Sequence, residues 1–596
     1  MVWSTSVMCW VTCVGSTRTP YIGGCVKSDV SNYLELMACV YADATMKCIA
    51  DVSDLRDLDT IQSRVKSEGL SFLTITLPAF CSDFEKSLCE GFVASTSFPG
   101  FKRVKGGAIP AFLQGMLRQV FDQETGRLFD EDSPRGILDD VPTVVESVRQ
   151  ICCTLKKVEI PCTPEREFRA VENFKETERS FSSFQAPSSV NSFCAVADLL
   201  WGVVLADFSV DDLVPKHGPG ATAERISGNQ KYDWLYWYDR LEPYFSLVGH
   251  AYPLGIADNR EMFEKVTIVP RDEEQPVRVV LVPKTLKAPR VIAIEPVCMQ
   301  YAQQAVRSFL YRRIEHSLLT GGSINFRDQS VNQRLAVHGS IDGSLATIDM
   351  SDASDRVPLS LIELMLRSVP DLLGAVLACR STSAQLPNGE VISPLRKFAS
   401  MGSALCFPIE AMYFYTICVV ALLEADNLPI SYNSLLQVKS MIHVYGDDII
   451  VPSDKANIVL SHLQKYHCKV NARKTFITGR FRESCGMDAY AGVSVTPIYV
   501  RVGHPENKRR ASELASWVAT RNLFYRKGYW RTTRYIQDWI YRVLGDLPYL
   551  DEESDGLGYH SFLGYRSVER WNSGLHRFEV KTYVPSPVRR TDRIEG

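Results

Sequence analysis

The sequence predicts an α+β fold in which a mixed region of strands and helices is flanked by mainly helical regions. Residues 340–500 alternate between short apolar runs typical of strands and segments with helical spacing. Residues 265–295 have the pattern of β-hairpins that carry basic residues. Residues 110–200 and the segment after 505 are largely helical by the same criterion. No internal repeat or Gly/Ser linker separates these regions, so we expect parts that interlock.

The composition limits the classes of protein that the chain can represent. It has 596 residues, of which 45% are hydrophobic and 23% charged, which is typical of a globular protein with a large core. A formal net charge of -3 excludes a uniformly basic nucleic-acid coat but not a locally basic groove. The 17 cysteines are scattered without a C-x-x-C pair, which predicts reduced thiols instead of a zinc site or a disulfide framework.

Two segments near the start of the chain allow local predictions. Residues 70–77, LSFLTITL, alternate and are rich in β-formers, so we expect a strand that Pro78 ends. Residues 112–117 have apolar side chains at helical spacing, which predicts a helix.

The longest uncharged apolar stretch, residues 411–423, has thirteen residues, whereas a membrane span needs about 20. The sequence therefore predicts no membrane span.

Three features between residues 340 and 480 carry the predicted chemistry. The apolar strand LATID, residues 345–349, delivers Asp349 at its end, and Pro358 then opens a helix. Residues 441–451, MIHVYGDDIIV, place Asp447 and Asp448 in a tight turn between two apolar strands. Adjacent carboxylates repel one another unless a cation screens them, and hard oxygen ligands suit Mg²⁺ or Mn²⁺. The third feature is the small-residue loop SMGS, residues 400–403, which leads into a long apolar helix.

Each of these features also has a simpler structural explanation. A Gly-Asp-Asp turn is commonly a solvated hairpin, Asp349 could be a turn residue, and the loop at 400–403 could be a helix cap. Their order and spacing favour a catalytic site, because Ser400 follows Asp349 by 51 residues and Asp447 follows Ser400 by 47.

This series resembles motifs A, B and C of right-hand-shaped, template-dependent RNA polymerases. More narrowly, the chain resembles the replicase β subunit of the leviviruses, which are small single-stranded RNA phages. The resemblance covers about residues 68–540. It rests on five further segments, which are KHGPGAT at 216–222, VPK at 282–284 with RVIAIEP at 290–296, DQSVNQR at 328–334, FRESCG at 481–486 and VTPIYVR at 495–501.

The resemblance implies the division of the chain. It predicts a right-hand polymerase with fingers, a palm made of an antiparallel sheet plus helices, and a thumb. Residues 61–340 would be mainly fingers, 341–500 the palm with motifs A to E, and 501–596 a mainly helical thumb or C-terminal region. Residues 1–60 have no assigned role.

The resemblance also implies the catalytic residues. Asp349 and Asp447 match the two ligands that bridge two Mg²⁺ or Mn²⁺ ions, with Asp448 in support. Lys474, in NARKTF at 471–476, lies in the motif D region, where a lysine protonates the pyrophosphate leaving group. A surface lysine is the equally weighted alternative. Cys485 lies near Glu483, but without a partner histidine it is expected to be a packed structural cysteine.

The nucleotide site follows from the same motifs. Lys284, Lys287 and Arg290 match the basic finger motif that holds the incoming triphosphate, and without the flanking match they would be interpreted as a solvated turn. Asp355 matches the position that senses the ribose hydroxyl, together with Ser400 and Gly402 in motif B. Where the family pattern has Asn after Met-Gly, this chain has Ser403.

The segment 505–542 is predicted to contact RNA. It holds nine Lys or Arg residues against three acids, with eight interleaved aromatics. The cations proposed to contact RNA are Arg509, Arg526, Arg531 and Arg534. Such a segment suits phosphate contact and base stacking, and the alternative is an amphipathic bundle with aromatics in its core. We expect aromatics mostly in the core and cations facing the RNA product.

The leading interpretation is an RNA-directed RNA polymerase that copies single-stranded RNA from ribonucleoside triphosphates. A reverse transcriptase shares the palm motifs, and a non-catalytic RNA-binding phage protein would not need the carboxylates. No G-x-x-x-x-G-K-[ST] motif is present, which disfavours an ATPase or helicase. The resemblance implies the cytoplasm of a bacterial host cell as the location and host elongation factors Tu and Ts as partners.

Overall fold

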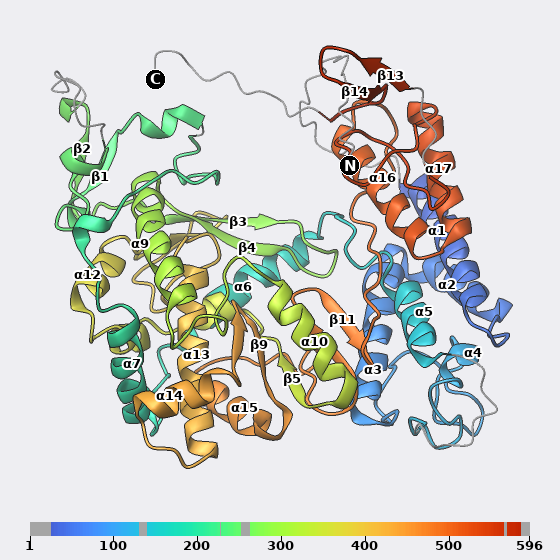
Figure 1. Cartoon of the computed structure of the whole chain (residues 1–596), viewed down its shortest axis with the longest axis horizontal. Helices are drawn as coiled ribbons and strands as arrows, with labels where there is room; N and C mark the ends of the chain where they lie inside the picture. The colour runs from blue at the N-terminus through green and yellow to red at the C-terminus, as the bar shows by residue number, and fades with distance from the viewer. Residues whose placement is uncertain (1–25, 130–139, 227, 252–262, 565–568, 586–596) are drawn as a thin grey trace. The chain divides into compact units, whose positions relative to one another are not determined.

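The computed structural model describes residues 26–129, 140–226, 228–251, 263–564 and 569–585. It combines helices and sheets (Figure 1), and 46% of the described residues are helical. The chain divides into two compact units. The first comprises Met1–Thr163, Pro283–Ala288 and Val495–Arg589, and the second Pro164–Val282, Pro289–Ser494 and Arg590–Gly596.

The first unit is built mainly from helices drawn from both ends of the chain. Its elements are α1 (Val26–Lys47), α2 (Leu55–Glu68), a short π-helix (Phe72–Thr76), α3 (Leu77–Glu90), α4 (Gln114–Leu117), α5 (Val141–Cys153), α16 (Ala511–Arg526), α17 (Trp530–Leu544), β13 (Glu569–Asn572) and β14 (Arg577–Val580). Helix α1 packs against α5 and α17, and α16 packs against α17 (Figure 1). Ile536, Ile540 and Leu544 recur every four residues and form the buried stripe of α17.

The predicted strand at residues 70–77 is wrong, because these residues are helical. Phe72–Thr76 form the π-helix and Leu77–Glu90 continue as α3. Pro78 lies in the first turn of α3, directly after the π-helix, so its missing N–H falls where the helical hydrogen-bond pattern changes. The buried residues Leu77, Phe80, Phe84 and Leu88 keep the spacing of one helical face. The alternation within eight residues was therefore a fragment of a longer helical pattern.

The second unit contains the sheets that carry the predicted chemistry, together with nine helices of the described chain. The helices are α6 (Pro164–Ser180), α7 (Val190–Val204), α9 (Val297–His316), α10 (Ser330–Asp342), α11 (Leu359–Met365), α12 (Pro370–Ala378), α13 (Cys406–Ala425), α14 (Tyr432–Lys439) and α15 (Ala456–Lys465). The strands are β1 (Tyr236–Tyr238), β2 (Thr267–Val269), β3 (Val277–Val282), β4 (Arg290–Ile294), β5 (Leu345–Ile348), β6 (Ala384–Gln385), β7 (Val391–Ile392), β8 (His443–Tyr445), β9 (Asp448–Pro452), β10 (Phe481–Ser484), β11 (Met487–Tyr490) and β12 (Val493–Ser494).

The central sheet of this unit has the order β5–β9–β8 and is antiparallel throughout. Helix α13 contacts β8, α7, α14 and α15, and lies beside this sheet in Figure 1. A second sheet, β4–β3–β6–β7, contains the predicted basic hairpin as β3 and β4. Strand β2 departs from the hairpin prediction for residues 265–295, because it pairs in parallel with β1.

Helix α13 is the apolar helix predicted after residue 403. Among the described residues it is the one helix long and apolar enough, by length and composition, to cross a membrane. However, 94% of that stretch is buried inside the protein, where Tyr413, Ile417 and Leu422 have no exposed surface. Its place in the second unit is that of a core helix. Most cysteines in the described part of the chain are buried thiols.

Candidate active site

The strand pairing brings the predicted carboxylates to one edge of the central sheet. Ile348 of β5 pairs with Ile449 of β9, so Asp349, the next residue, lies across from Asp448. Tyr445 pairs with Asp448, which leaves Gly446 and Asp447 as a two-residue turn. Gly446 has φ +61°, and a Cβ atom there would overlap the ring of Phe407. This turn therefore requires glycine before the aspartates.

The segment before Phe476 holds Asp349 from the other side of β5. Thr347 and Phe476 exchange backbone hydrogen bonds of 3.0 and 2.9 Å. Asn471 donates from Nδ2 to Asp349 Oδ2 at 2.7 Å and from its backbone N–H to the Asp349 carbonyl at 2.9 Å. Asp349 is thus fixed at both its side chain and its backbone. The sequence analysis missed Asn471, because this contact joins residues 122 positions apart.

Asp448 is held by two of the five segments on which the narrow resemblance rests, residues 328–334 and 481–486. The backbone N–H of Cys485 donates to Asp448 Oδ2 at 3.2 Å. Asn332 Nδ2 donates to the Asp448 carbonyl at 3.3 Å, and Gln333 Nε2 donates to the Cys485 carbonyl at 3.0 Å. Burial raises the pKa of the Cys485 thiol, and the Asp448 carboxylate raises it further. A protonated thiol agrees with the expected structural cysteine.

Two carboxylates of this edge, those of Asp349 and Asp448, are half-buried and repel one another. Burial, opposed by Lys474 and reinforced by Glu483, raises the pKa of Asp349 to about 6. Burial, followed by the charge of Asp447, raises the pKa of Asp448 to about 7. Each shift means that the site disfavours a full set of negative charges without a nearby cation.

Lys474 supplies one such cation. Its Nζ atom lies 3.1 Å from Glu483 Oε1 and 3.6 Å from Asp349 Oδ1. Burial alone would lower the pKa of Lys474, but the charges of Glu483 and Asp349 raise it overall. The structure therefore brings Lys474 to the predicted carboxylates, and it adds Glu483 to them.

Glu410 on α13 is a further acidic residue that the sequence analysis did not include. Its carboxyl is buried, and burial together with the charge of Asp447 raises its pKa well above the usual range. Cys406 Sγ lies 3.7 Å from Glu410 Oε2. The signal in the sequence was an acid between two apolar runs of a core helix, which is costly unless the acid is protonated or paired.

The chemistry of these donors fits a divalent cation. All are carboxylate oxygens, which Mg²⁺ and Mn²⁺ prefer. The pKa values of Asp349 and Asp448 are raised first by burial and also by neighbouring carboxylates, and a bound cation would offset both effects. Within the described ranges, no group of three His, Cys, Asp or Glu side chains is close enough to coordinate one metal ion. Asp447 is exposed at the turn.

The predicted ribose-sensing residues come together beside the loop at 400–403. Ser400 Oγ donates to Asp355 Oδ1 at 2.8 Å. Ser403 Oγ instead donates to Gln303 Oε1 at 3.2 Å. Gly402 has φ +128°, and a Cβ atom there would overlap the Ala293 carbonyl oxygen. The loop therefore approaches β4 closely, which only glycine permits.

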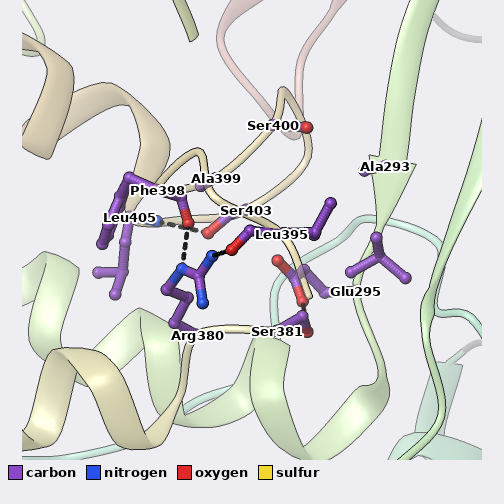
Figure 2. Close-up of a pocket in the computed structure, with 11 residues that line it drawn as sticks. Ala293, Glu295, Arg380, Ser381, Leu395, Phe398, Ala399, Ser400, Ser403 and Leu405 are labelled. Atoms are coloured by element: carbon purple, nitrogen blue, oxygen red, sulfur yellow. Dashed lines mark hydrogen bonds between the residues drawn. The ribbon is translucent and has the colours of Figure 1, made fainter. Parts of the chain in front are cut away.

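A small pocket lies under this loop (Figure 2). Arg380 lines it, and three backbone carbonyls surround the guanidinium, at 2.6 Å from Phe398 and 2.7 Å from both Leu395 and Lys397. Burial lowers the pKa of Arg380 to about 10. Glu295 accepts a hydrogen bond from Ser381 in the same pocket. These buried polar groups hold the backbone that leads into the loop.

The basic hairpin residues are separated between the two units. Lys284 and Lys287 belong to the first unit, whereas Arg290 begins β4 in the second. All three side chains are exposed. Their role in binding the triphosphate stays a prediction.

The predicted RNA-contacting arginines differ in their availability. Arg509, Arg531 and Arg534 are exposed on the first unit. Arg526 is paired with Glu552 and contacts His560. Trp517, Phe524 and Tyr529 are buried, whereas Trp530 is 53% exposed. The segment thus buries several aromatics and exposes most of its cations, but Arg521 is buried.

The comparisons with known proteins agree with the motifs. Residues 260–530 match the family model described as RNA replicase, beta-chain. The RNA-directed RNA polymerase beta chain of Escherichia phage MS2 is 40% identical over 220 residues, which are 37% of each chain. The beta subunit of Escherichia virus Qbeta is 37% identical over 226 residues, 38% of this chain and 35% of that one.

A longer match is made by the beta subunit from Qbeta virus strain MX1, which is 32% identical over 292 residues, 48% of this chain and 46% of that one. The matches therefore span less than half the length of these relatives. A solved chain described as an RdRp complex is 11% identical and aligns with a TM-score of 0.33 over 44% of this chain and 26% of that chain. The resemblance to the levivirus RNA-directed RNA polymerase beta subunit is thus confirmed by sequence across residues 260–530.

Proposed function

We propose that the chain is an RNA-directed RNA polymerase that copies single-stranded RNA from ribonucleoside triphosphates. The observation that carries this proposal is the meeting of Asp349 and Asp448 across β5 and β9, with Lys474 between Asp349 and Glu483. Phosphoryl transfer depends on positioning and charge neutralisation, and this edge provides both. The identity to named polymerase beta chains supports the same reaction.

Asp349, Asp447 and Asp448 would hold the metal ions. Two bound Mg²⁺ or Mn²⁺ ions supply activation of the 3′-hydroxyl and charge neutralisation at the leaving pyrophosphate. Asn471 fixes the orientation of Asp349, and the Cys485 backbone fixes that of Asp448. Lys474 is held by carboxylates in its charged form, from which it can donate a proton to the leaving group.

The remaining residues select and position the substrates. Asp355, Ser400 and Gly402 form the ribose side of the nucleotide site, and Lys284, Lys287 and Arg290 bind the triphosphate. Arg509, Arg531 and Arg534 contact RNA phosphates on the first unit, where they are exposed. Arg526 contributes less, because Glu552 already pairs with it.

We assign the right-hand layout to the chain on the same grounds. Residues 61–340 would be mainly fingers, 341–500 the palm and 501–596 the thumb or C-terminal region. The enzyme would act in the cytoplasm of a bacterial host cell. Host elongation factors Tu and Ts would be its partners, as the levivirus resemblance implies.

Primer extension on an RNA template with Mg²⁺ tests this proposal. The purified chain is assayed with and without bacterial lysate, and with ribonucleotides or deoxyribonucleotides. We expect template-dependent incorporation of ribonucleotides, with stimulation by lysate if host factors are required. A preference for deoxyribonucleotides would indicate a reverse transcriptase. RNA binding without incorporation under every condition would indicate a non-catalytic RNA-binding protein and overturn the proposal.

A further inference from the structure

A lysine that no motif contains lies directly behind the ribose-sensing aspartate. The side chain of Lys397 has no exposed surface, and its Nζ atom lies 2.9 Å from Asp355 Oδ1. The same ammonium lies 3.3 Å from the centre of the Phe174 ring on α6. A buried ammonium is costly unless it is paired, so this contact fixes both partners.

The backbone around Lys397 is held in place independently. Arg380 donates to the carbonyls of Leu395, Lys397 and Phe398, as Figure 2 shows in part. The Phe398 N–H donates to the Val357 carbonyl at 2.8 Å, which ties this segment to the chain just after Asp355. The backbone of Lys397 is therefore fixed by hydrogen bonds, and this restricts the position of its ammonium group and of the Asp355 carboxylate that pairs with it.

The two oxygens of Asp355 have different surroundings. Oδ1 receives both the Lys397 ammonium at 2.9 Å and the Ser400 hydroxyl at 2.8 Å. Within the described part of the chain no hydrogen bond reaches Oδ2, and the side chain remains 16% exposed. One oxygen is fixed and the other is left as an acceptor. A ribose 2′-hydroxyl is a donor of the kind that such an oxygen binds.

Ser403 makes its side-chain hydrogen bond to Gln303 and not to Asp355. It occupies the position where the family pattern has Asn, but its hydroxyl faces Gln303. The Ala404 N–H also donates to Gln303 Oε1, at 3.0 Å. The chain thus supports Asp355 with Lys397 and Ser400 and uses Ser403 to anchor the start of α13.

We infer that Lys397 is a positioning residue for ribose selection, which holds Asp355 Oδ1 so that Oδ2 accepts the 2′-hydroxyl of the incoming nucleotide. This inference rests on the proposed polymerase activity. Lys397 acts through Asp355 and does not itself touch the nucleotide. A site built to bind a hydroxyl discriminates against the analogue that lacks it, because its own polar group is left unpaired.

The test compares kcat/KM for a ribonucleotide and for its 2′-deoxy analogue on one RNA template. In Lys397→Met, we expect the ribonucleotide value to fall at least about tenfold, while the deoxyribonucleotide value changes little. Lys175→Met is the matched control, because Lys175 on α6 pairs with Glu390 at 2.9 Å and does not contact Asp355. It should leave the ratio of the two values unchanged.

A double-mutant cycle separates positioning from a structural role. In an Asp355→Asn background, adding Lys397→Met should cause no further loss of discrimination, because the lysine then has no carboxylate to position. The double variant also removes both charges of the buried pair, so it should unfold at a higher temperature than either single variant. It keeps the test decisive if Lys397→Met alone does not fold.

Different results would overturn the role of Lys397 and the polymerase activity. Equal loss with both nucleotides, or a further loss of discrimination in the Asp355→Asn background, would overturn the role of Lys397 while leaving the polymerase activity intact. Absence of incorporation by the unmodified chain would overturn the polymerase and the inference together.

Discussion

Two ionic clusters, one in each unit, have opposite charge balance. In the first unit, Glu146 on α5 accepts from Lys47 at 2.8 Å, from Lys527 at 3.2 Å and from the Tyr529 hydroxyl at 2.9 Å. Burial alone would raise the pKa of Glu146, but the two lysines lower it overall. In the second unit, Asp349, Asp448 and Glu483 share Lys474.

The first cluster joins parts of the fold, whereas the second has the charge imbalance that we expect of a cation-binding site. Around Glu146, two ammonium groups and a hydroxyl satisfy one carboxylate, and helices from both ends of the chain are joined as a result. Around Asp349, one ammonium serves several carboxylates, and the pKa values of Asp349 and Asp448 rise. An excess of half-buried negative charge costs stability, and such perturbed groups are typical of functional sites.

The largest expected effect is on activity when a carboxylate of the second cluster is neutralised. Asp349→Asn or Asp447→Asn should reduce nucleotide incorporation at least about 10²–10³-fold, because a group that controls developing charge is lost. Circular dichroism and thermal unfolding should show an intact fold. Asp352→Asn, at an exposed position of the same loop, is the control. Normal incorporation by Asp349→Asn would remove this residue from the site.

A change in the shape of the loop at 400–403 should reduce activity nearly as much as the loss of an aspartate. Gly402→Ala would push the loop away from the Ala293 carbonyl, and displacement of a positioned group by about 1 Å can cost about 10²-fold in rate. Gly389→Ala is the matched control, because Gly389 also has positive φ but has no atom within 4 Å of the added Cβ. Equal loss in both variants would attribute the effect to backbone strain alone.

Removing the carboxylate of the first cluster should affect stability more than chemistry. Glu146→Gln leaves Lys47 and Lys527 without their common counter-charge and should destabilise the chain by about 3 kcal/mol. Denaturant unfolding measures the loss. Glu90→Gln, which breaks the looser Lys86–Glu90 pair at 3.9 Å, should cost no more than about 0.5 kcal/mol. Similar losses in the two variants would contradict the structural role given to Glu146.

The two clusters should also respond oppositely to pH. The folded-state pKa of Asp448 is raised to about 7, so its contribution to stability is present below its unfolded value of about 3.9 and is lost as pH rises through 7. The pKa of Glu146 is lowered, so its contribution is present above its unfolded value and is lost as pH falls through the folded one.

Thermal unfolding of the metal-free chain in a chelator measures this difference. The unfolding temperature of the unmodified chain, relative to that of Asp448→Asn, should fall between pH 4 and 8. Mg²⁺ at pH 8 should restore more stability to the unmodified chain than to the variant. A pH-independent difference between the two would mean that Asp448 titrates normally in the folded state.

The smallest effect should be on RNA binding by the first unit. Each of Arg531 and Arg534 that contacts a phosphate of single-stranded RNA adds about 0.7 to the slope of log K against log salt concentration. Alanine at both positions should reduce that slope, whereas Arg526→Ala should change it less, because Arg526 pairs with Glu552. Filter binding over a salt series would show whether this ranking is wrong.

The meeting of the carboxylates was predictable because they lie in short, ordered motifs. Asp349 and Asp448 end or begin strands whose apolar residues specify their pairing, and Gly446 marks the turn. Asn471 and Lys397 were not predictable, because their contacts depend on tertiary packing and no local pattern marks them. The pairing of Arg526 with Glu552 is of the same kind.

The fold was predictable where periodicity extended over a whole element. Helix α13 and the hairpin β3–β4 follow from long apolar or alternating runs. Residues 70–77 were misassigned because eight residues fit both periods, and the helical pattern is visible only when α3 is included. The composition of the first unit from both ends of the chain has no local signature at all.

The backbone contact to Asp448 has a consequence for how this site tolerates sequence change. Because the donor is the Cys485 main-chain N–H, no substitution at 485 deletes it except proline. Cys485 has φ +50° and Gly486 has φ +76°. The turn therefore favours residues that adopt positive φ, but it does not require a thiol at 485. A library of variants at 485 should therefore retain Asn and Gly, which adopt this conformation readily. The identity of the side chain can drift there while the aspartate stays in place.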